Sequence, residues 1–364
     1  MFKKILYFII FVIIIIIVLN ILNLQNDSTD TKTKVNVEKG NPNTLRYLAE
    51  KRKFYVGSAV DSNLLRSSSK YTKILGSQLN MIATENEMKF DLIHPQKSKY
   101  NFEPADKIIE FAEKNNQVVR GHTLVWANRV PAWVQSGNYN KEQMKQILKQ
   151  HIQTVVGHYK GKIYAWDVIN EAITKDGKLN DSIWLRTIGP EYIQLAFQWA
   201  HEADPNALLF YNDNGMENNN KKFNALYRLL KKFKDSNVPI DGIGYQMHSW
   251  IARDIDYSNL SNQFQMLRET GLQVQITEMD IGMASPKNES YPSKAQKQAE
   301  IYSKVLDTCL KNSNCSAFVM WGITDRYTPK YKPEKPLIFD SEFKPKKSYW
   351  SLVNTLKEYN KQKK

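Results

Sequence analysis

The sequence predicts an α/β fold: a single (β/α)8 TIM barrel, preceded by an N-terminal hydrophobic segment and a short linker. Short apolar runs alternate with longer amphipathic runs over most of the 364 residues, and no second block of different composition follows. Almost every short run also ends in polar residues, as expected where the strands of a barrel converge on one mouth. With 42% of its residues hydrophobic, the chain can fill one large core.

Eight of the short apolar runs are expected to be strands. They are Phe54–Ala59, Leu79–Thr84, Val118–Thr123, Ile163–Asn170, Ala207–Asn212, Gly242–His248, Gln273–Asp280 and Ala317–Gly322. The amphipathic runs predict helices, among them Pro104–Asn115, Lys141–Tyr159, Glu191–Ala203, Glu217–Phe233 and Ser293–Leu310. We therefore expect residues 44–360 to form one domain.

The first 24 residues are expected to be separate from the barrel. Lys3 and Lys4 precede an almost unbroken apolar run from Ile5 to Leu24, which is typical of export. The run approaches the length of a membrane span and no small-residue cleavage site follows it. A cleaved signal peptide and an uncleaved membrane anchor at residues 5–24 both remain open, and either places the rest of the chain outside the cytoplasmic membrane. Residues 25–43 are polar, lack periodicity and are expected to be a linker.

The formal net charge is +14 at neutral pH. The lysines are scattered through the predicted helices and the C-terminal tail, without a basic stripe interleaved with aromatic residues, so nucleic acid is not an expected partner. No metal-ligand spacing is visible either, and we expect a monomer that needs no cofactor.

Two cysteines occur, Cys309 and Cys315. They are either two buried thiols or a small disulfide loop, and export favours the disulfide.

Two glutamates stand at predicted strand ends, Glu171 in WDVINE and Glu278 in ITEMD. Two carboxyl groups that face each other across a sugar-binding cleft are what glycoside hydrolysis requires, because one protonates the leaving oxygen and the other attacks or activates water. Either glutamate taken alone could be a surface ion-pair partner. Their matching strand-end positions, with Asn170 beside Glu171, favour the catalytic interpretation.

From about Leu45 to the last helix, the sequence resembles the family 10 xylanases. The resemblance is carried by seven blocks in matching order and spacing: TENEMKF (84–90), RGHTLVW (120–126), WDVINE (166–171), LFYND (209–213), GIGYQMH (242–248), ITEMDI (276–281) and WGITD (321–325). It implies endo-1,4-β-xylanase activity with retention of configuration, xylan or xylo-oligosaccharides as the substrate, and no cofactor. It also implies a disulfide between Cys309 and Cys315.

The resemblance assigns Glu171 as acid/base and Glu278 as nucleophile. Around them it implies a set of supporting and sugar-binding residues: Asn170 on the sugar 2-hydroxyl, His248 and Asp280 as a pair that orients Glu278, Gln246 beside them, Glu85, Asn86, Lys89 and His122 on hydroxyls at subsites −1 and −2, and Trp126 and Trp321 as apolar walls. We expect Asp167 and Asp213 to support the site without reacting. Core packing is the alternative for His122, His248 and Trp321, and a solvated charge is the alternative for Lys89.

Three positions depart from the family pattern. Phe90 and Pro329 each replace an expected tryptophan, and Ala127 replaces an expected histidine. We expect weaker binding of the glycone at Pro329, while the catalytic pair is intact. The alternatives are a related barrel glycosidase acting on short xylo-oligomers or cello-type glucan, and a xylan-binding barrel without activity.

Overall fold

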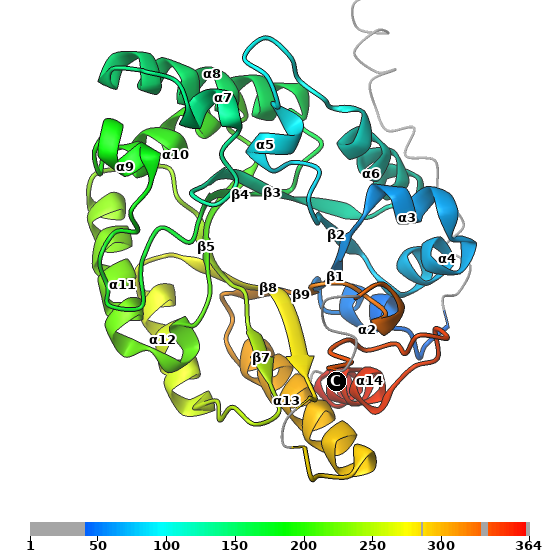
Figure 1. The fold of residues 1–364 in the computed structure, drawn as a ribbon. Helices are drawn as coiled ribbons and strands as arrows, with labels where there is room; N and C mark the ends of the chain where they lie inside the picture. The colour runs from blue at the N-terminus through cyan, green and yellow to red at the C-terminus, as the bar shows by residue number, and fades with distance from the viewer. Residues whose placement is uncertain (1–40, 285–286, 329–333, 362–364) are drawn as a thin grey trace, which may run out of the picture. The chain divides into compact units, whose positions relative to one another are not determined.

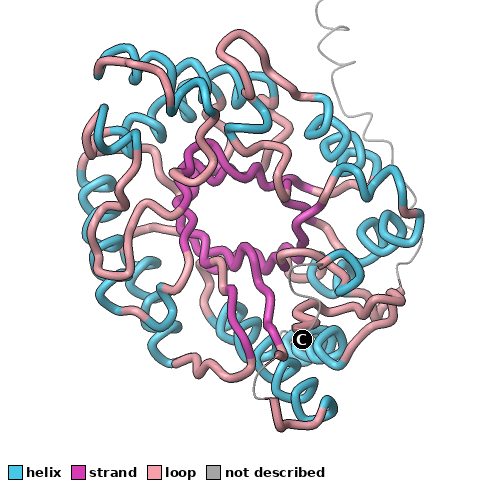
Figure 2. The backbone as a smooth tube through the Cα atoms, viewed as in Figure 1, coloured by secondary structure: helices cyan, strands magenta, loops and turns pink. Residues whose placement is uncertain are grey.

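A computed structural model, which describes residues 41–284, 287–328 and 334–361, shows a closed parallel β-barrel within a ring of helices (Figure 1). The predicted fold class is confirmed. Figure 2 shows the strands as an inner wall and the helices outside it, with loops joining the two layers. Both faces of the barrel strands are buried, which explains why they read in the sequence as nearly continuous apolar runs.

All pairings between the named strands are parallel, and the order around the barrel is β6-β5-β4-β3-β2-β1-β9-β8, closed by pairing of β6 with β8. The strands are β1 (Tyr55–Val60), β2 (Met81–Thr84), β3 (Val118–Trp126), β4 (Ala165–Asn170), β5 (Leu208–Asp213), β6 (Gly242–Tyr245), β8 (Gln273–Gly282) and β9 (Cys315–Met320). Seven of the eight predicted strands are present as single elements, with ends that differ by a few residues.

The sixth predicted strand, Gly242–His248, is wrong as a single element. The structure ends β6 at Tyr245 and begins a short strand β7 (His248–Trp250) that pairs only with the far end of β8. Met247 between them has a left-handed backbone, with φ at 60°, which a regular strand cannot contain. The break brings His248 opposite Asp280 in β8.

Helices surround the barrel in chain order. They are α2 (Leu45–Glu50), α3 (Ser62–Ser67), α4 (Ser69–Gln78), α5 (Phe90–Ile93), α6 (Glu103–Lys114), α7 (Ala132–Gln135), α8 (Lys141–His158), α9 (Ile183–Thr187), α10 (Tyr192–Ala203), α11 (Asn220–Asp235), α12 (Tyr257–Glu269), α13 (Tyr291–Lys311) and α14 (Lys347–Lys361), with 3₁₀ turns at Met216–Asn218 and Asp325–Tyr327. In α6, the buried residues Ala105, Ile108, Ile109 and Ala112 recur every three or four positions, so one face of the helix packs on the barrel.

The predicted helix Glu217–Phe233 begins too early. Residues Met216–Asn218 form a 3₁₀ turn, and α11 starts at Asn220. Asn219 sets this start because its side chain accepts a hydrogen bond from the backbone N–H of Lys222 at 3.1 Å, as an N-cap does.

The predicted export segment and most of the predicted linker lie outside the described residues. Within the part of the chain that the structure does describe, no helix is both long and apolar enough to cross a membrane. Pro329 also lies outside the described residues.

Cys309, near the end of α13, forms a disulfide with Cys315, the first residue of β9. Of the two alternatives for the cysteines, the bridged one is therefore present. The bond closes a short loop between a helix and the strand that follows it.

We predict that replacing both cysteines by alanine lowers the free energy of unfolding by about 2 kcal/mol, because the bridge removes loop-closure entropy from the unfolded chain. Urea unfolding of the wild type and the double variant measures this. The wild type in reducing buffer should approach the variant. Equal stability of the oxidised and reduced wild type would contradict the prediction.

Candidate active site

Ten of the predicted site residues line one cleft of about 540 Å³ at the carboxyl ends of the barrel strands. They are Lys89, His122, Trp126, Asn170, Glu171, Gln246, His248, Glu278, Asp280 and Trp321. Glu85 lines an adjoining hollow, and Asn86 accepts a hydrogen bond from Lys89 at 3.0 Å. The structure thus brings the whole predicted set together.

Glu278 lies in β8 and is 4% exposed. Its Oε2 lies 3.0 Å from Nε2 of His248, and its Oε1 accepts a hydrogen bond from Nδ2 of Asn212 at 2.7 Å. Burial by itself would raise the pKa of Glu278, but the hydrogen bond from His248 and the positive potential of His122 and His248 outweigh burial and lower that pKa. Glu278 is therefore held as a carboxylate.

His248 bridges two carboxylates. Its Nε2 contacts Glu278, and its Nδ1 lies 3.0 Å from Oδ1 of Asp280. Burial would lower the pKa of His248, yet the charges of Asp280 and Glu278 and their hydrogen bonds raise it well above the usual value. A protonated imidazole donates from both ring nitrogens, which fits both contacts.

Glu171 follows directly after β4 and is half-buried. Its φ is 56°, a left-handed conformation that turns the side chain out of the strand direction. Gln246 donates to its Oε1 at 2.9 Å, and the indole N–H of Trp126 donates to its Oε2 at 3.1 Å. Trp126 was predicted as an apolar wall, and the structure adds this polar contact.

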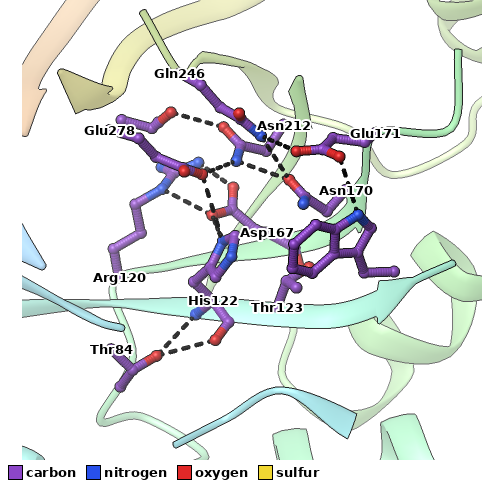
Figure 3. Close-up of polar contacts among 12 residues, drawn as sticks. Thr84, Arg120, His122, Thr123, Asp167, Asn170, Glu171, Asn212, Gln246 and Glu278 are labelled. Atoms are coloured by element: carbon purple, nitrogen blue, oxygen red, sulfur yellow. Dashed lines mark hydrogen bonds and ion pairs between the residues drawn. The ribbon is translucent and has the colours of Figure 1, made fainter. Parts of the chain in front are cut away.

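A chain of side-chain amides connects the two glutamates (Figure 3). Nδ2 of Asn212 donates to Glu278 at 2.7 Å and to Oδ1 of Asn170 at 2.9 Å. Gln246 donates to the same Asn170 oxygen at 3.2 Å and to Glu171 at 2.9 Å. Both donors bind Oδ1 of Asn170, and within the described residues its NH₂ group makes no hydrogen bond. This NH₂ group can therefore donate to a ligand in the cleft.

A buried ion pair lies below the glutamates and was not predicted from the sequence. Arg120 in β3, 1% exposed, contacts Asp167 in β4 and Gln275 in β8 across the barrel interior. Oδ2 of Asp167 in turn lies 3.0 Å from Nδ1 of His122, as Figure 3 shows. The expectation that Asp167 supports the site agrees with this geometry. The available signal was a charged residue inside the apolar run VVRGHTLV.

Gly244 in β6 makes room for this network. A Cβ at this position would lie 2.2 Å from Oδ1 of Asn212, 2.8 Å from Cγ2 of Thr277 and 3.1 Å from Nη2 of Arg120. A larger residue would therefore displace the side chain that holds Glu278.

Lys89 lines the cleft beside two tryptophan rings. Its Nζ lies 5.3 Å from the ring centre of Trp126 and 5.7 Å from that of Trp321, within the range of cation–π contacts. Burial, followed by the nearby charge of Arg129, lowers the pKa of Lys89. Arg129, like Arg120, Asn212 and Gln275, was not among the predicted site residues, and its Nη1 lies 3.5 Å from Oδ1 of Asn86.

Two of the three departures from the family pattern are within the described residues, and neither lines the cleft. Phe90 is 2% exposed and stacks on His151, with 3.4 Å between ring centres. Ala127 is half-buried directly after β3. Phe90 therefore contributes to the core, behind Lys89.

The cleft continues on both sides of the glutamates. It shares Glu171, Asn214, Gly215 and Arg253 with a hollow of about 610 Å³, and Asp280 and Trp321 with another of about 280 Å³ that contains Glu85. The described residues thus form a trough with the carboxyl pair in its middle part. No group of three or more His, Cys, Asp or Glu side chains among them is arranged to hold a metal ion.

Comparison with known proteins gives a consistent result. Residues 44–355 match glycosyl hydrolase family 10. Endo-1,4-beta-xylanase B of Thermotoga neapolitana is 42% identical over 325 residues, which cover 88% of this chain and 93% of that protein. The crystal structure of native xylanase 10B from Thermotoga maritima aligns with a TM-score of 0.85 at 42% identity, covering 88% of this chain and 99% of that one. Xylanase 10B from Thermotoga petrophila, solved in complex with xylobiose, aligns with a TM-score of 0.84 at 42% identity, covering 87% and 98% of the two chains. The chain belongs to glycosyl hydrolase family 10.

Proposed function

We propose that this chain is an endo-1,4-β-xylanase that hydrolyses internal xylosidic bonds of xylan with retention of configuration. The observation that carries the proposal is the trough with Glu171 and Glu278 in its middle part, in different hydrogen-bonding environments. Family membership and the xylobiose complex of the Thermotoga petrophila relative support xylan as the substrate class. We further propose that residues 44–360 are the catalytic domain.

In the first step, Glu278 attacks the anomeric carbon while Glu171 protonates the leaving oxygen. Glu278 is suited to attack because His248 and Asn212 hold its carboxylate in place and keep it ionised. Glu171 is suited to proton transfer because it is half-buried and both of its protein donors, Gln246 and Trp126, are neutral. The products of this step are a glycosyl ester on Glu278 and a released sugar chain.

In the second step, Glu171 accepts a proton from a water molecule that attacks the ester. Two inversions at the anomeric carbon give overall retention. Asn170 is linked to Glu278 through Asn212 and to Glu171 through Gln246. A hydrogen bond from its NH₂ group to the sugar 2-hydroxyl would stabilise the charged transition state.

The endo mode of action is supported by the continuation of the trough beyond both ends of the catalytic pair. A chain that is bound through sugars on both sides of the cleaved bond can enter at any internal position. Product profiles from glucuronoxylan, arabinoxylan and cellulose test the proposal. A mixture of short xylo-oligosaccharides is expected, whereas glucose oligomers as the main product would contradict it.

We predict that Glu278→Ala abolishes turnover of every substrate, while Glu171→Ala lowers kcat/KM on xylan by about 10²–10⁴-fold and lowers kcat/KM much less on an aryl xyloside with a good leaving group. An activated phenolate needs no proton to leave. Steady-state kinetics on both substrates measure the difference, with Glu342→Ala, at an exposed surface residue, as the control.

Added azide sharpens this test, because it is a nucleophile that needs no general base. It should restore turnover of Glu171→Ala on the aryl xyloside and give a β-xylosyl azide. Equal loss in both variants on this substrate, or an inverted product from the wild type, would refute the assigned roles.

Trp250 is the residue that we expect to pack against a sugar ring on the leaving-group side of the cleft. Its indole is 51% exposed, lines the cleft and lies 5.7 Å from the guanidinium carbon of Arg253, which also lines the hollow beyond Glu171. A large apolar ring left open to solvent in a sugar cleft can pack on the C–H face of a pyranose.

We predict that Trp250→Ala raises KM for xylopentaose about ten-fold, because an aromatic packing contact of about 1.5 kcal/mol is lost. Trp350→Ala is the matched control, since Trp350 is 46% exposed on α14 and does not line the cleft. An unchanged KM in the Trp250 variant would show that no sugar packs there.

We also propose that the enzyme acts outside the cytoplasmic membrane, released or tethered through residues 5–24. The Lys3–Lys4 start and the apolar run Ile5–Leu24 support this location. Cell fractionation should find the activity in the medium or in the membrane fraction. Removal of residues 1–24 should shift it to the cytosol. Activity of the full chain mainly in the cytosol would contradict the proposal.

A further inference from the structure

Tyr211 and Asp213 at the end of β5 form a buried cluster that the mechanism above does not use. Successive side chains of a strand point to opposite faces. Asn212 points into the barrel, where it binds Glu278, so Tyr211 and Asp213 point to the outer face of the strand. Both are fully buried.

The cluster contacts the backbone turn that carries Glu171. The backbone N–H of Ala172 donates to the hydroxyl oxygen of Tyr211 at 2.9 Å. An amide N–H can only donate, so the tyrosine hydroxyl accepts here and gives its own hydrogen to Oδ2 of Asp213 at 2.7 Å. The orientation of the hydroxyl is therefore fixed by its two partners.

Asp213 is itself held in place. Its Oδ1 accepts hydrogen bonds from Nζ of Lys222 at 2.7 Å and from the backbone N–H of Asn214 at 2.8 Å. Burial raises the pKa of Asp213 to about 6, and the charge of Lys222 opposes this rise. At neutral pH the carboxylate is thus ionised and accepts all three donors.

The end of β5 makes a second hydrogen bond to this turn, at Glu171 itself. The backbone N–H of Glu171 donates to the carbonyl oxygen of Asn212 at 2.9 Å. Glu171 has a left-handed backbone, with φ at 56°, which costs free energy in a residue other than glycine. Such a conformation persists where hydrogen bonds to the surrounding structure fix it. The contacts at residues 171 and 172 supply them.

We propose that Tyr211, oriented by Asp213 and Lys222, is a positioning residue for the acid/base glutamate. It fixes the turn at Glu171–Ala172 so that the carboxyl group of Glu171 points at the leaving oxygen. The inference rests on the proposed function, because it presupposes that Glu171 transfers the proton. Residues 211–213 then position both glutamates: Asn212 binds Glu278, and Tyr211 fixes the turn that carries Glu171.

The test is Tyr211→Phe, assayed with a series of aryl β-glycosides whose phenols differ in acidity. Since kcat/KM reports the steps up to release of the phenol, a misplaced acid lowers it only for poor leaving groups. We expect about a ten-fold loss in kcat/KM on the least acidic phenol and a change within about two-fold on dinitrophenol, with KM little altered. A defect that is only structural would lower kcat/KM for all leaving groups equally.

Tyr245→Phe is the matched control. Tyr245 is a fully buried tyrosine on the neighbouring strand β6, and its hydroxyl donates to Gln263 in α12 at 3.1 Å. Within the described part of the chain this hydroxyl makes no hydrogen bond to the Glu171 turn. This variant should show a uniform and small effect. If Tyr211→Phe folds poorly, Asp213→Asn removes the carboxylate that orients the tyrosine and should give the same dependence on the leaving group.

The series is run on glycosides of whichever sugar the wild type cleaves. Preference for a glucoside would overturn xylan as the substrate and leave the test of Tyr211 intact.

Hydrogen exchange at the Ala172 amide adds a readout that needs no turnover, because the N–H loses its acceptor in Tyr211→Phe and should exchange faster. No change in exchange, or an equal loss for all leaving groups, would overturn the inference.

Discussion

The carboxylate of Glu278 is negatively charged and only 4% of the residue is exposed. The rest of the site is arranged to stabilise this buried charge. An ionised carboxylate in such surroundings costs several kcal/mol unless hydrogen bonds and positive charge compensate it. No single element provides them. His248 comes from β7, Asn212 from β5 and His122 from β3, and Arg120 lies below with Asp167. A closed parallel barrel brings the ends of all these strands to one place, so the fold makes the compensation possible.

Two breaks in the strand geometry lie close to the glutamates. Met247, with φ at 60°, ends β6 and lets His248 pair with the end of β8 beside Asp280. Glu171, with φ at 56°, leaves the line of β4 and turns its carboxyl toward Gln246 and Trp126. Backbone conformations of this kind cost about 1–3 kcal/mol each and persist where surrounding contacts fix them. Glu171 belongs to the proposed catalytic pair, and Met247 lies between Gln246 and His248, which contact that pair.

The fold class, and the position of Glu171 and Glu278 in one cleft, could be predicted because each depends on a local pattern: strands buried on both faces form apolar runs, and polar residues follow them. The contact between Arg120 and Gln275 could not be predicted. The charge inside VVRGHTLV marks Arg120 as unusual, but it does not tell which residues on other strands are its partners. The break at Met247 was missed because GIGYQMH has the composition of one continuous strand. Tyr211 was missed for a similar reason, as a tyrosine in a strand usually indicates packing.

The two glutamates are bound by donors of different kinds, and this difference assigns their roles more firmly than their positions do. Glu278 is buried and contacts a histidine whose pKa is raised well above its usual value, so its partner is cationic. Glu171 is half-buried and contacts only neutral donors among the described residues, Gln246 and Trp126. A cationic partner favours a permanent carboxylate, which a nucleophile needs, whereas neutral donors and partial exposure allow a carboxyl group to exchange its proton with substrate and water. The reverse assignment would place the exchanging proton on the group that is most strongly held as an anion.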